Sequence, residues 1–339
     1  MGMKIVSAGP LTTVQDRGRT GCAAGGFQES GCCDKYAMEL ANLLAGNLDN
    51  AGEAAVLECT LRGPSLIFDA PTIFALTGAD MGAVLSDRPV PRFAPLYAEA
   101  GDLLTLGFAK DGLRGYFAVY GGIDVPPVMG SRSTNVKCRI GGYEGRALRD
   151  GDALAVAPGA VEPPAYWEWL QERRGGLPDF SAYGGWYAHA TRPWRFVDGR
   201  ACPLFRVVPG PQEDAFTPAG QNTFTRSLYT VTTDANRMAC KLNGPAIETV
   251  NGSDILSDGI VEGSVQVSSN GQPIVMMADH QTTGGYAKIG TVISTDIPAM
   301  AQVRPGEQVS FCFVSPEEAI DLYRKEVRKL VDIKERIRP

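Results

Sequence analysis

The densest polar stretch of the sequence, residues 279–288, reads DHQTTGGYAK and follows an apolar run at 274–278. Polar side chains at a strand end beside two glycines suit a binding site, because glycine lets a ligand approach the backbone. Asp279 would act as a base or orient His280. Donors for a carboxylate, carbonyl or phosphate would come from Gln281, Thr282, Thr283 and Lys288. The alternative is a polar turn whose hydroxyls bond within the turn.

Two further clusters combine arginine with small polar residues and glycine. One contains Gln15, Asp16, Arg17 and Arg19. The other contains Ser131, Arg132, Ser133, Thr134 and Arg146, with glycines at 141 and 142. Arginine in such a setting would clamp an anion with two parallel hydrogen bonds. The alternative for each cluster, taken alone, is a surface ion pair.

Composition excludes several classes of protein and site. With 2 histidines in 339 residues, a multi-histidine metal site is excluded and no metal is expected. A net charge of -6 argues against nucleic acid as a partner, and no apolar run is long enough to cross a membrane. The start shows no signal peptide, so we expect a cytoplasmic protein whose 8 cysteines are reduced. The motifs of dinucleotide-binding, P-loop and serine-hydrolase sites are absent.

The elements that must position these residues are mostly strands. The 40 glycines favour a mainly β fold, and apolar runs predict strands. These lie at 65–68, 72–76, 103–106, 116–120, 153–156, 205–208, 228–232, 264–267, 274–278, 292–294 and 309–314. Helices are expected over 34–45, with leucines on one face, and over 166–173.

The chain is long enough for two lobes. We expect a β lobe at 1–157, a linker or insertion rich in Trp, Pro and Gly at 158–200, a β lobe at 201–314 and a helix at 315–339. Four tryptophans are unexpected in a solvent-exposed linker, because large aromatic side chains are usually buried, so we expect that segment to pack on another part of the protein. Ser315, Pro316 and two acids start the last helix. Its expected docked face consists of Ile320, Tyr323, Val327, Leu330 and Ile337.

Motifs along nearly the whole chain resemble one family. The opening run is GPLTTVQDRGR at 9–19. In the order of that family follow LTGAD at 76–80, GGI at 121–123, GSRST at 130–134, GR at 145–146, PGPQ at 209–212, SDG at 257–259, GQP at 271–273 and the stretch 279–288. The sequence is similar to the biotin-dependent carboxyltransferase family, which includes the C subunit of 5-oxoprolinase. The same family is also labelled KipI antagonist (KipA) and allophanate hydrolase subunit 2.

The resemblance implies two cyclophilin-like β-barrel lobes, with a few short helices, and a role in a complex. The implied partners are the KipI-like B subunit of 5-oxoprolinase and its LamB/YcsF-like A subunit. The implied reaction is the ATP-dependent opening of 5-oxo-L-proline to L-glutamate, with ATP used by the complex. A lactam is a poor electrophile, so phosphorylation of its oxygen would create a leaving group for water to displace.

This reaction needs cations for phosphate and an acid or base. Arg19, Arg132 and Lys288 would supply the cations, and Asp16, Asp80 and Asp279 are the candidate acids or bases. We expect Lys288 and the three aspartates to be catalytic. The residues expected to bind substrate are Gln15, Arg19, Arg132, Ser133, Gln212, His280, Gln281, Thr282 and Thr283.

One stretch departs from the family pattern, and two other functions stay open. At 236 and 239, Asn236 and Ala239 stand where the family usually has an acid and a glycine, which puts an acidic role there in doubt while Arg237 remains. The first alternative is the carboxyltransferase component of a urea carboxylase and allophanate system, which would require biotin; this chain has no Met-Lys-Met biotinylation site. The second is a non-enzymatic antagonist that binds a KipI-like kinase inhibitor.

Overall fold

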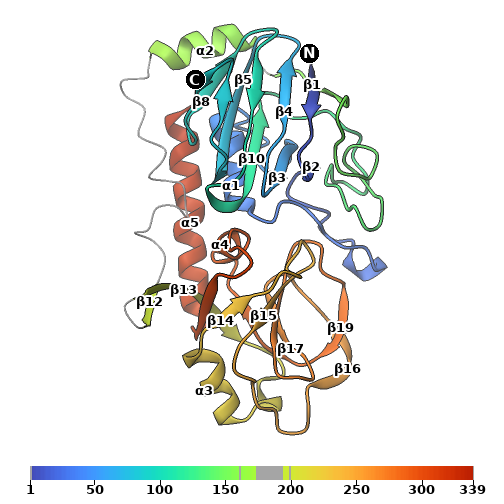
Figure 1. Ribbon diagram of the computed structural model, residues 1–339, viewed down its shortest axis with the longest axis vertical. Coiled ribbons are helices and arrows are strands. Elements are labelled where there is room, and N and C mark those ends of the chain that lie inside the picture. The colour runs from blue at the N-terminus through green and yellow to red at the C-terminus, as the bar shows by residue number, and fades with distance from the viewer. Residues whose placement is uncertain (1, 160–161, 173–193, 198–199, 339) are drawn as a thin grey trace. The chain divides into compact units, whose positions relative to one another are not determined.

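The computed structural model describes residues 2–159, 162–172, 194–197 and 200–338, and it divides into two compact units. Unit 1 comprises Met1–Thr20, Ser30–Ala188 and Arg328–Pro339. Unit 2 comprises Gly21–Glu29 and His189–Val327. The predicted mainly β fold with few helices and a C-terminal helix is confirmed (Figure 1). Much of the predicted segment 158–200 lies outside the described residues.

Unit 1 contains two antiparallel sheets. The first has six strands in the order β11 (Ala153–Ala155), β1 (Gly2–Ser7), β4 (Ser65–Phe68), β9 (Leu103–Thr105), β6 (Val84–Leu85) and β7 (Arg88–Pro89). The second has five strands in the order β2 (Leu11–Gln15), β3 (Val56–Thr60), β10 (Asp111–Val119), β5 (Thr72–Asp80) and β8 (Pro95–Ala98). One apolar core draws buried side chains from both sheets.

The five-stranded sheet is buried on both faces, which explains why its central strands are apolar almost throughout. Successive side chains of a strand point to opposite faces. Phe74 and Phe117 therefore enter the core between the sheets, while Ala75 and Ala118 lie in the cluster formed with α1 (Lys35–Leu44). Figure 1 shows α1 beside β10 and β5. The helix predicted over 34–45 is confirmed, and Asp34 caps it by accepting a hydrogen bond from the Ala37 amide at 2.8 Å.

The short helix α2 (Pro163–Glu172) confirms that part of the Trp-rich segment packs on unit 1. Trp167 stacks on Tyr97 with ring centroids 5.4 Å apart, and Trp169 stacks on Tyr166 at 5.8 Å. Trp194 lies in β12 (Trp194–Val197), and Trp186 lies outside the described residues.

Unit 2 contains a closed barrel of seven strands. Their order is β13 (Arg200–Pro209), β20 (Lys288–Val292), β17 (Ser264–Val267), β18 (Pro273–Met276), β15 (Ala239–Asn243), β14 (Tyr229–Val231) and β21 (Gln308–Phe313). A parallel pairing of β13 with β21, from Leu204 opposite Ser310 to Val207 opposite Phe313, closes the ring. Closure leaves no free edge in the barrel and gives the buried Phe205, Val265 and Phe311 a common interior.

Further elements of unit 2 lie outside the ring of seven strands. They are η1 (Ala23–Gly25), β12 (Trp194–Val197), η5 (Glu213–Ala215), α3 (Pro218–Arg226), α4 (Ile297–Met300) and a separate ribbon of β16 (Asp254–Gly259) with β19 (Thr283–Tyr286). Phe224 of α3 stacks on Phe311 with ring centroids 4.6 Å apart, so α3 covers the barrel core. The strand predicted at 292–294 is wrong in its bounds, because β20 begins at Lys288 and pairs there with β17.

The C-terminal helix α5 (Pro316–Arg336) begins where the sequence predicts, but its buried face is only partly the predicted one. Ile333 and Ile337 are buried in the α1 cluster of unit 1, with Leu330 against them. The predicted contacts of Ile320, Tyr323 and Val327 are wrong, because these residues are exposed. They lie roughly a quarter turn around the helix from Leu330, Ile333 and Ile337.

Two further findings concern the cysteines and the membrane. All eight cysteines are free thiols, as predicted, and burial raises the pKa of Cys59 to about 12. Within the described residues, no helix is both long and apolar enough to cross a membrane.

Candidate functional site

The candidate site in unit 2 is built around Lys288, the first residue of β20. Its ammonium group lies 2.7 Å from the carboxylate of Asp258 in β16. The side-chain amide of Gln212 donates to the same carboxylate at 3.2 Å, and the Lys288 backbone amide donates to the Gln212 side-chain oxygen at 3.2 Å. Three segments far apart in the sequence therefore share one hydrogen-bonded cluster.

Glycine makes room for this cluster in the loop that carries Gln212. A Cβ atom at Gly210 would lie 2.3 Å from the carbonyl oxygen of Lys288, so no other residue fits there without a backbone shift. Close approach of this loop to β20 places Gln212 over Lys288. The close approach of this loop to β20 therefore explains the glycine of the PGPQ motif.

The cluster joins a buried cation to an exposed anion. The side chain of Lys288 is 4% exposed, whereas that of Asp258 is 51% exposed. The hydrogen bond from Lys288 lowers the pKa of Asp258, and bonds from the Gly259 amide and Gln212 act in the same direction. Asp258 therefore stays ionised at neutral pH. A buried ammonium at the rim of a barrel can stabilise negative charge that develops on a bound carbonyl or phosphoryl oxygen.

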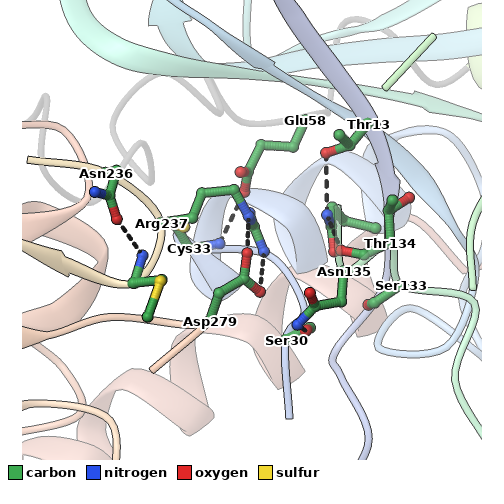
Figure 2. A network of polar contacts seen from close by, with 12 residues as sticks. Thr13, Ser30, Cys33, Glu58, Ser133, Thr134, Asn135, Asn236, Arg237 and Asp279 are labelled. Carbon is green, nitrogen blue, oxygen red and sulfur yellow. Dashed lines mark hydrogen bonds and ion pairs between the residues drawn. The ribbon is translucent and has the colours of Figure 1, made fainter. Parts of the chain in front are cut away.

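Asp279 makes a second, buried ion pair in unit 2 (Figure 2). Its two carboxylate oxygens accept from Arg237, from Nε at 2.8 Å and from Nη2 at 3.1 Å. Both residues are less than one-tenth exposed. Because each oxygen already accepts a charged donor, the arrangement orients the guanidinium of Arg237 and stabilises the charge of Asp279.

The departure at Asn236 has a local explanation. The side-chain oxygen of Asn236 accepts from the Met238 amide at 2.7 Å (Figure 2). Its side-chain nitrogen donates to the Asp234 carbonyl at 2.9 Å. Asparagine commonly makes such turns. Asn236 therefore shapes the turn that presents Arg237, and no acid is needed for that purpose.

The other predicted residues of the 279–288 stretch have different surroundings. His280 is buried, and its Nδ1 lies 2.7 Å from the Gln281 carbonyl oxygen. Gln281 and Thr283 are exposed and Thr282 is half-buried. Thr283 belongs to β19, the partner strand of β16.

In unit 1, the structure brings five predicted site residues together around Asp16. Its carboxylate accepts from the Ser131 hydroxyl at 2.6 Å, the Arg132 amide at 2.5 Å, the Gly18 amide at 2.9 Å and the Ser133 hydroxyl. Asp16 is 4% exposed. It therefore ties the segment 131–134 to the end of β2.

Gln15 and Arg19 complete this cluster, and both are buried. The Gln15 amide nitrogen donates to the Thr13 hydroxyl and the Thr134 carbonyl, each at 3.0 Å. Arg19 donates to the Ser133 carbonyl. Much of the polar capacity here is used within the chain, and a substrate-binding role for these residues stays a prediction.

Asp80 lies apart from the Asp16 cluster, at the end of β5, and lines a cavity that none of those residues lines. Arg132 donates from Nε to the Val125 carbonyl at 3.1 Å. Among the described residues, no group of three or more His, Cys, Asp or Glu could hold a metal ion.

Sequence reasoning missed Asp258 as a site residue. Its signal was present, since SDG at 257–259 was one of the ordered motifs. The bond to Lys288 depends on the ribbon of β16 and β19, whose register has an irregularity between Asp254 and Asp258. No spacing rule in the sequence predicts such a register.

Replacing Asp16 by alanine should release the segment 131–134. The variant removes the acceptor for several buried donors, and each unsatisfied group costs about 1–3 kcal/mol. We expect a loss of stability of about 2–4 kcal/mol and faster amide exchange across 131–134, measured by urea unfolding and hydrogen exchange. Asp124→Ala, at an exposed position of the same unit, is the control. Equal behaviour of the two variants would contradict the role of Asp16.

Known proteins match this chain along nearly all of its length. Residues 25–313 match the family model described as carboxyltransferase domain, subdomain A and B. The 5-oxoprolinase C subunit of Escherichia coli (strain K12) is 39% identical over 318 residues, which cover 94% of this chain and 93% of that protein. The 5-oxoprolinase C subunit of Haemophilus influenzae is 35% identical and covers 97% of this chain and 99% of that protein.

A solved structure agrees with the sequence matches. The crystal structure of the K. lactis urea amidolyase superposes with a TM-score of 0.81 at 25% identity, and it covers 98% of this chain and 20% of that much longer chain. The architecture described above is thus that of a carboxyltransferase region. The chain belongs to the carboxyltransferase domain family, of which the 5-oxoprolinase C subunits are members.

Proposed function

We propose that the chain is a subunit of an ATP-dependent 5-oxoprolinase complex that opens 5-oxo-L-proline to L-glutamate. The observation that carries the proposal is the full-length, one-to-one match to the 5-oxoprolinase C subunit, at 39% identity over 94% of this chain. Its partners in the complex are a KipI-like B subunit and a LamB/YcsF-like A subunit. The complex works in the cytoplasm, where ATP is supplied.

The chemistry of the Lys288 cluster supports this proposal. Opening a lactam moves negative charge onto the carbonyl oxygen, and ATP coupling adds the charge of a phosphoryl group. Lys288 supplies a buried ammonium to stabilise this charge, and Asp258 and Gln212 hold that ammonium in place. ATP supplies the phosphoryl group that activates the lactam carbonyl: water adds to the carbonyl carbon, the ring C–N bond breaks with the amine as leaving group, and a second water hydrolyses the resulting acyl phosphate to L-glutamate and phosphate.

One observation favours a second function, the transfer of a carboxyl group from carboxybiotin to urea. The K. lactis urea amidolyase has the same fold over 98% of this chain. That match spans 20% of the longer protein, whereas the match to the 5-oxoprolinase C subunit spans 93% of its relative. The lactam reaction is therefore the better supported of the two. A third reading, an antagonist that binds a KipI-like protein without catalysis, predicts binding and no turnover.

A reconstitution experiment separates these functions. The three proposed subunits are purified together, and ADP release is measured with 5-oxo-L-proline, with urea, and with neither. We expect ADP release that depends on 5-oxo-L-proline and falls to background when this chain is left out. An unchanged rate without the chain contradicts the proposal, and urea-dependent turnover that requires biotin favours carboxyl transfer. Tight binding to the KipI-like partner with no turnover favours the antagonist.

A further inference from the structure

Unit 1 contains a cavity of about 350 Å³ whose lining includes Asp80 but none of the residues of the Lys288 cluster. It lies where β5 ends, between the following turn at 81–83 and the segment 89–92. Its size falls within the range of small-molecule sites, which runs from about 300 to 1,000 Å³. Its walls mix aliphatic side chains, among them Leu76, Val84 and Leu106, with three charged residues.

Two of the charged residues, Asp80 and Lys110, lie close to Gly82. The Asp80 carboxylate accepts from the Gly82 amide at 2.9 Å. A Cβ atom at Gly82 would lie 3.1 Å from the ammonium nitrogen of Lys110. Within the part of the chain that the structure describes, neither Asp80 nor Lys110 forms an ion pair with another residue. The charge of each side chain is therefore available for an ion pair with a bound ligand.

The third charged residue, Arg92, is held in a fixed position. Its Nη1 donates to the Gly78 carbonyl at 2.5 Å, and its guanidinium lies 5.2 Å from the centre of the Phe93 ring. A guanidinium fixed in this way loses little entropy when it binds a carboxylate. Arg92 thus adds a second cation to the lining, beside Lys110.

We propose that this cavity binds an acidic amino acid. Such a molecule has one ammonium group, two carboxylates and a short apolar skeleton, so each of its charged groups has an oppositely charged side chain in the lining. Asp80 takes the ammonium, Lys110 and Arg92 take the carboxylates, and the methylene groups contact Val84 and Leu106. The inference rests on the cavity and not on the reaction proposed above.

Binding to the full chain, without partner subunits or ATP, tests the inference. Isothermal titration calorimetry compares L-glutamate with glutarate, which has both carboxylates and no ammonium. We expect saturable binding of L-glutamate and at least about tenfold weaker binding of glutarate, because glutarate cannot bond to Asp80. Absence of binding at millimolar L-glutamate overturns the inference, and so does equal affinity for the two ligands.

Three variants assign the contacts. Lys110→Met should weaken L-glutamate binding about tenfold or more. Asp80→Asn keeps an acceptor for the Gly82 amide and should remove the preference for L-glutamate over glutarate. Lys4→Met changes an exposed lysine of β1 in the same unit and should leave both affinities unchanged. Unaltered binding in the first two variants contradicts the assignment. Turnover of the reconstituted complex is measured separately with Lys110→Met, because Asp80 is itself a candidate catalytic residue. Loss of L-glutamate binding in Lys110→Met therefore bears on the cavity alone.

Discussion

The Lys288→Met variant should reduce the turnover of the reconstituted complex by about 100- to 1,000-fold. Loss of one preorganised group that stabilises developing negative charge typically costs this much. Lys288 is the cation of its cluster, and its side chain is 4% exposed, so water cannot replace it fully. The measurement is the kcat for ADP release that depends on 5-oxo-L-proline, together with KM. A loss confined to KM would assign Lys288 to substrate binding alone.

The fold of the Lys288→Met variant should survive. Methionine is similar in length, and the Asp258 carboxylate that loses its partner is half exposed and stays hydrated. The pKa of Asp258 should return toward its ordinary value, because Lys288 is the main cause of its lowering. A carboxyl group with a lowered folded-state pKa stabilises the fold above its ordinary pKa, and that contribution is lost as the pH falls through the lowered pKa. The wild-type and variant stabilities should therefore converge in acid.

A matched control exists on the same barrel. Lys241 pairs with Asp234 at 3.6 Å, and both side chains are at least half exposed. Exposed pairs of this kind contribute about 0–1 kcal/mol. Lys241→Met should leave turnover and stability unchanged. If Lys288→Met retained turnover within about twofold of the wild type, the role of Lys288 in stabilising charge would be wrong.

The Asp279→Ala variant should lose about 3–5 kcal/mol of folding stability, because it leaves the buried guanidinium of Arg237 without its carboxylate. Urea unfolding of the full chain measures this loss. The Asp234→Ala variant, at an exposed ion pair, is the control and should change stability by less than about 0.5 kcal/mol.

A double variant tests what the Asp279 pair does. When both partners become apolar, the two charges of the pair are removed together, so Arg237→Leu with Asp279→Leu should recover most of the lost stability. If the pair also serves the reaction, turnover stays low in this stable double variant. Recovery of both stability and turnover would assign the pair to the fold alone and would remove Asp279 from the candidate catalytic residues.

The elements that repeat a simple pattern could be predicted from the sequence. The strands at 65–68 and 264–267 agree with β4 and β17, and the helix at 34–45 agrees with α1, because short apolar runs mark the strands and an apolar face marks the helix. The start of α5 was equally clear from its capping residues. Its docked face was not, since two apolar stripes share that helix and the sequence does not say which of them meets a core.

The candidate site was harder to predict than the elements. Lys288 and Gln212 were found by motif, but their meeting at Asp258 depends on β16 and β20, which are not neighbours in any sheet. Asn236 was misjudged in the opposite direction, because the sequence suggested that a function was missing there. Loss of an acid looked like a loss of function, whereas the structure gives the asparagine its own task in a turn. Contacts between side chains on strands far apart in the sequence cannot be predicted from composition or from residue spacing.

The parallel pairing of β13 with β21 also has a consequence for how the protein folds during synthesis. The two strands are joined only after about a hundred intervening residues have been made, so the barrel cannot close until β21 leaves the ribosome. The core of unit 1 is completed later still, because its α1 cluster includes Ile333 and Ile337 near the end of the sequence. Until then the nascent chain exposes strand edges and apolar surface, the features that promote aggregation. We therefore expect soluble yield to depend on elongation rate and on chaperones that hold unfinished chains.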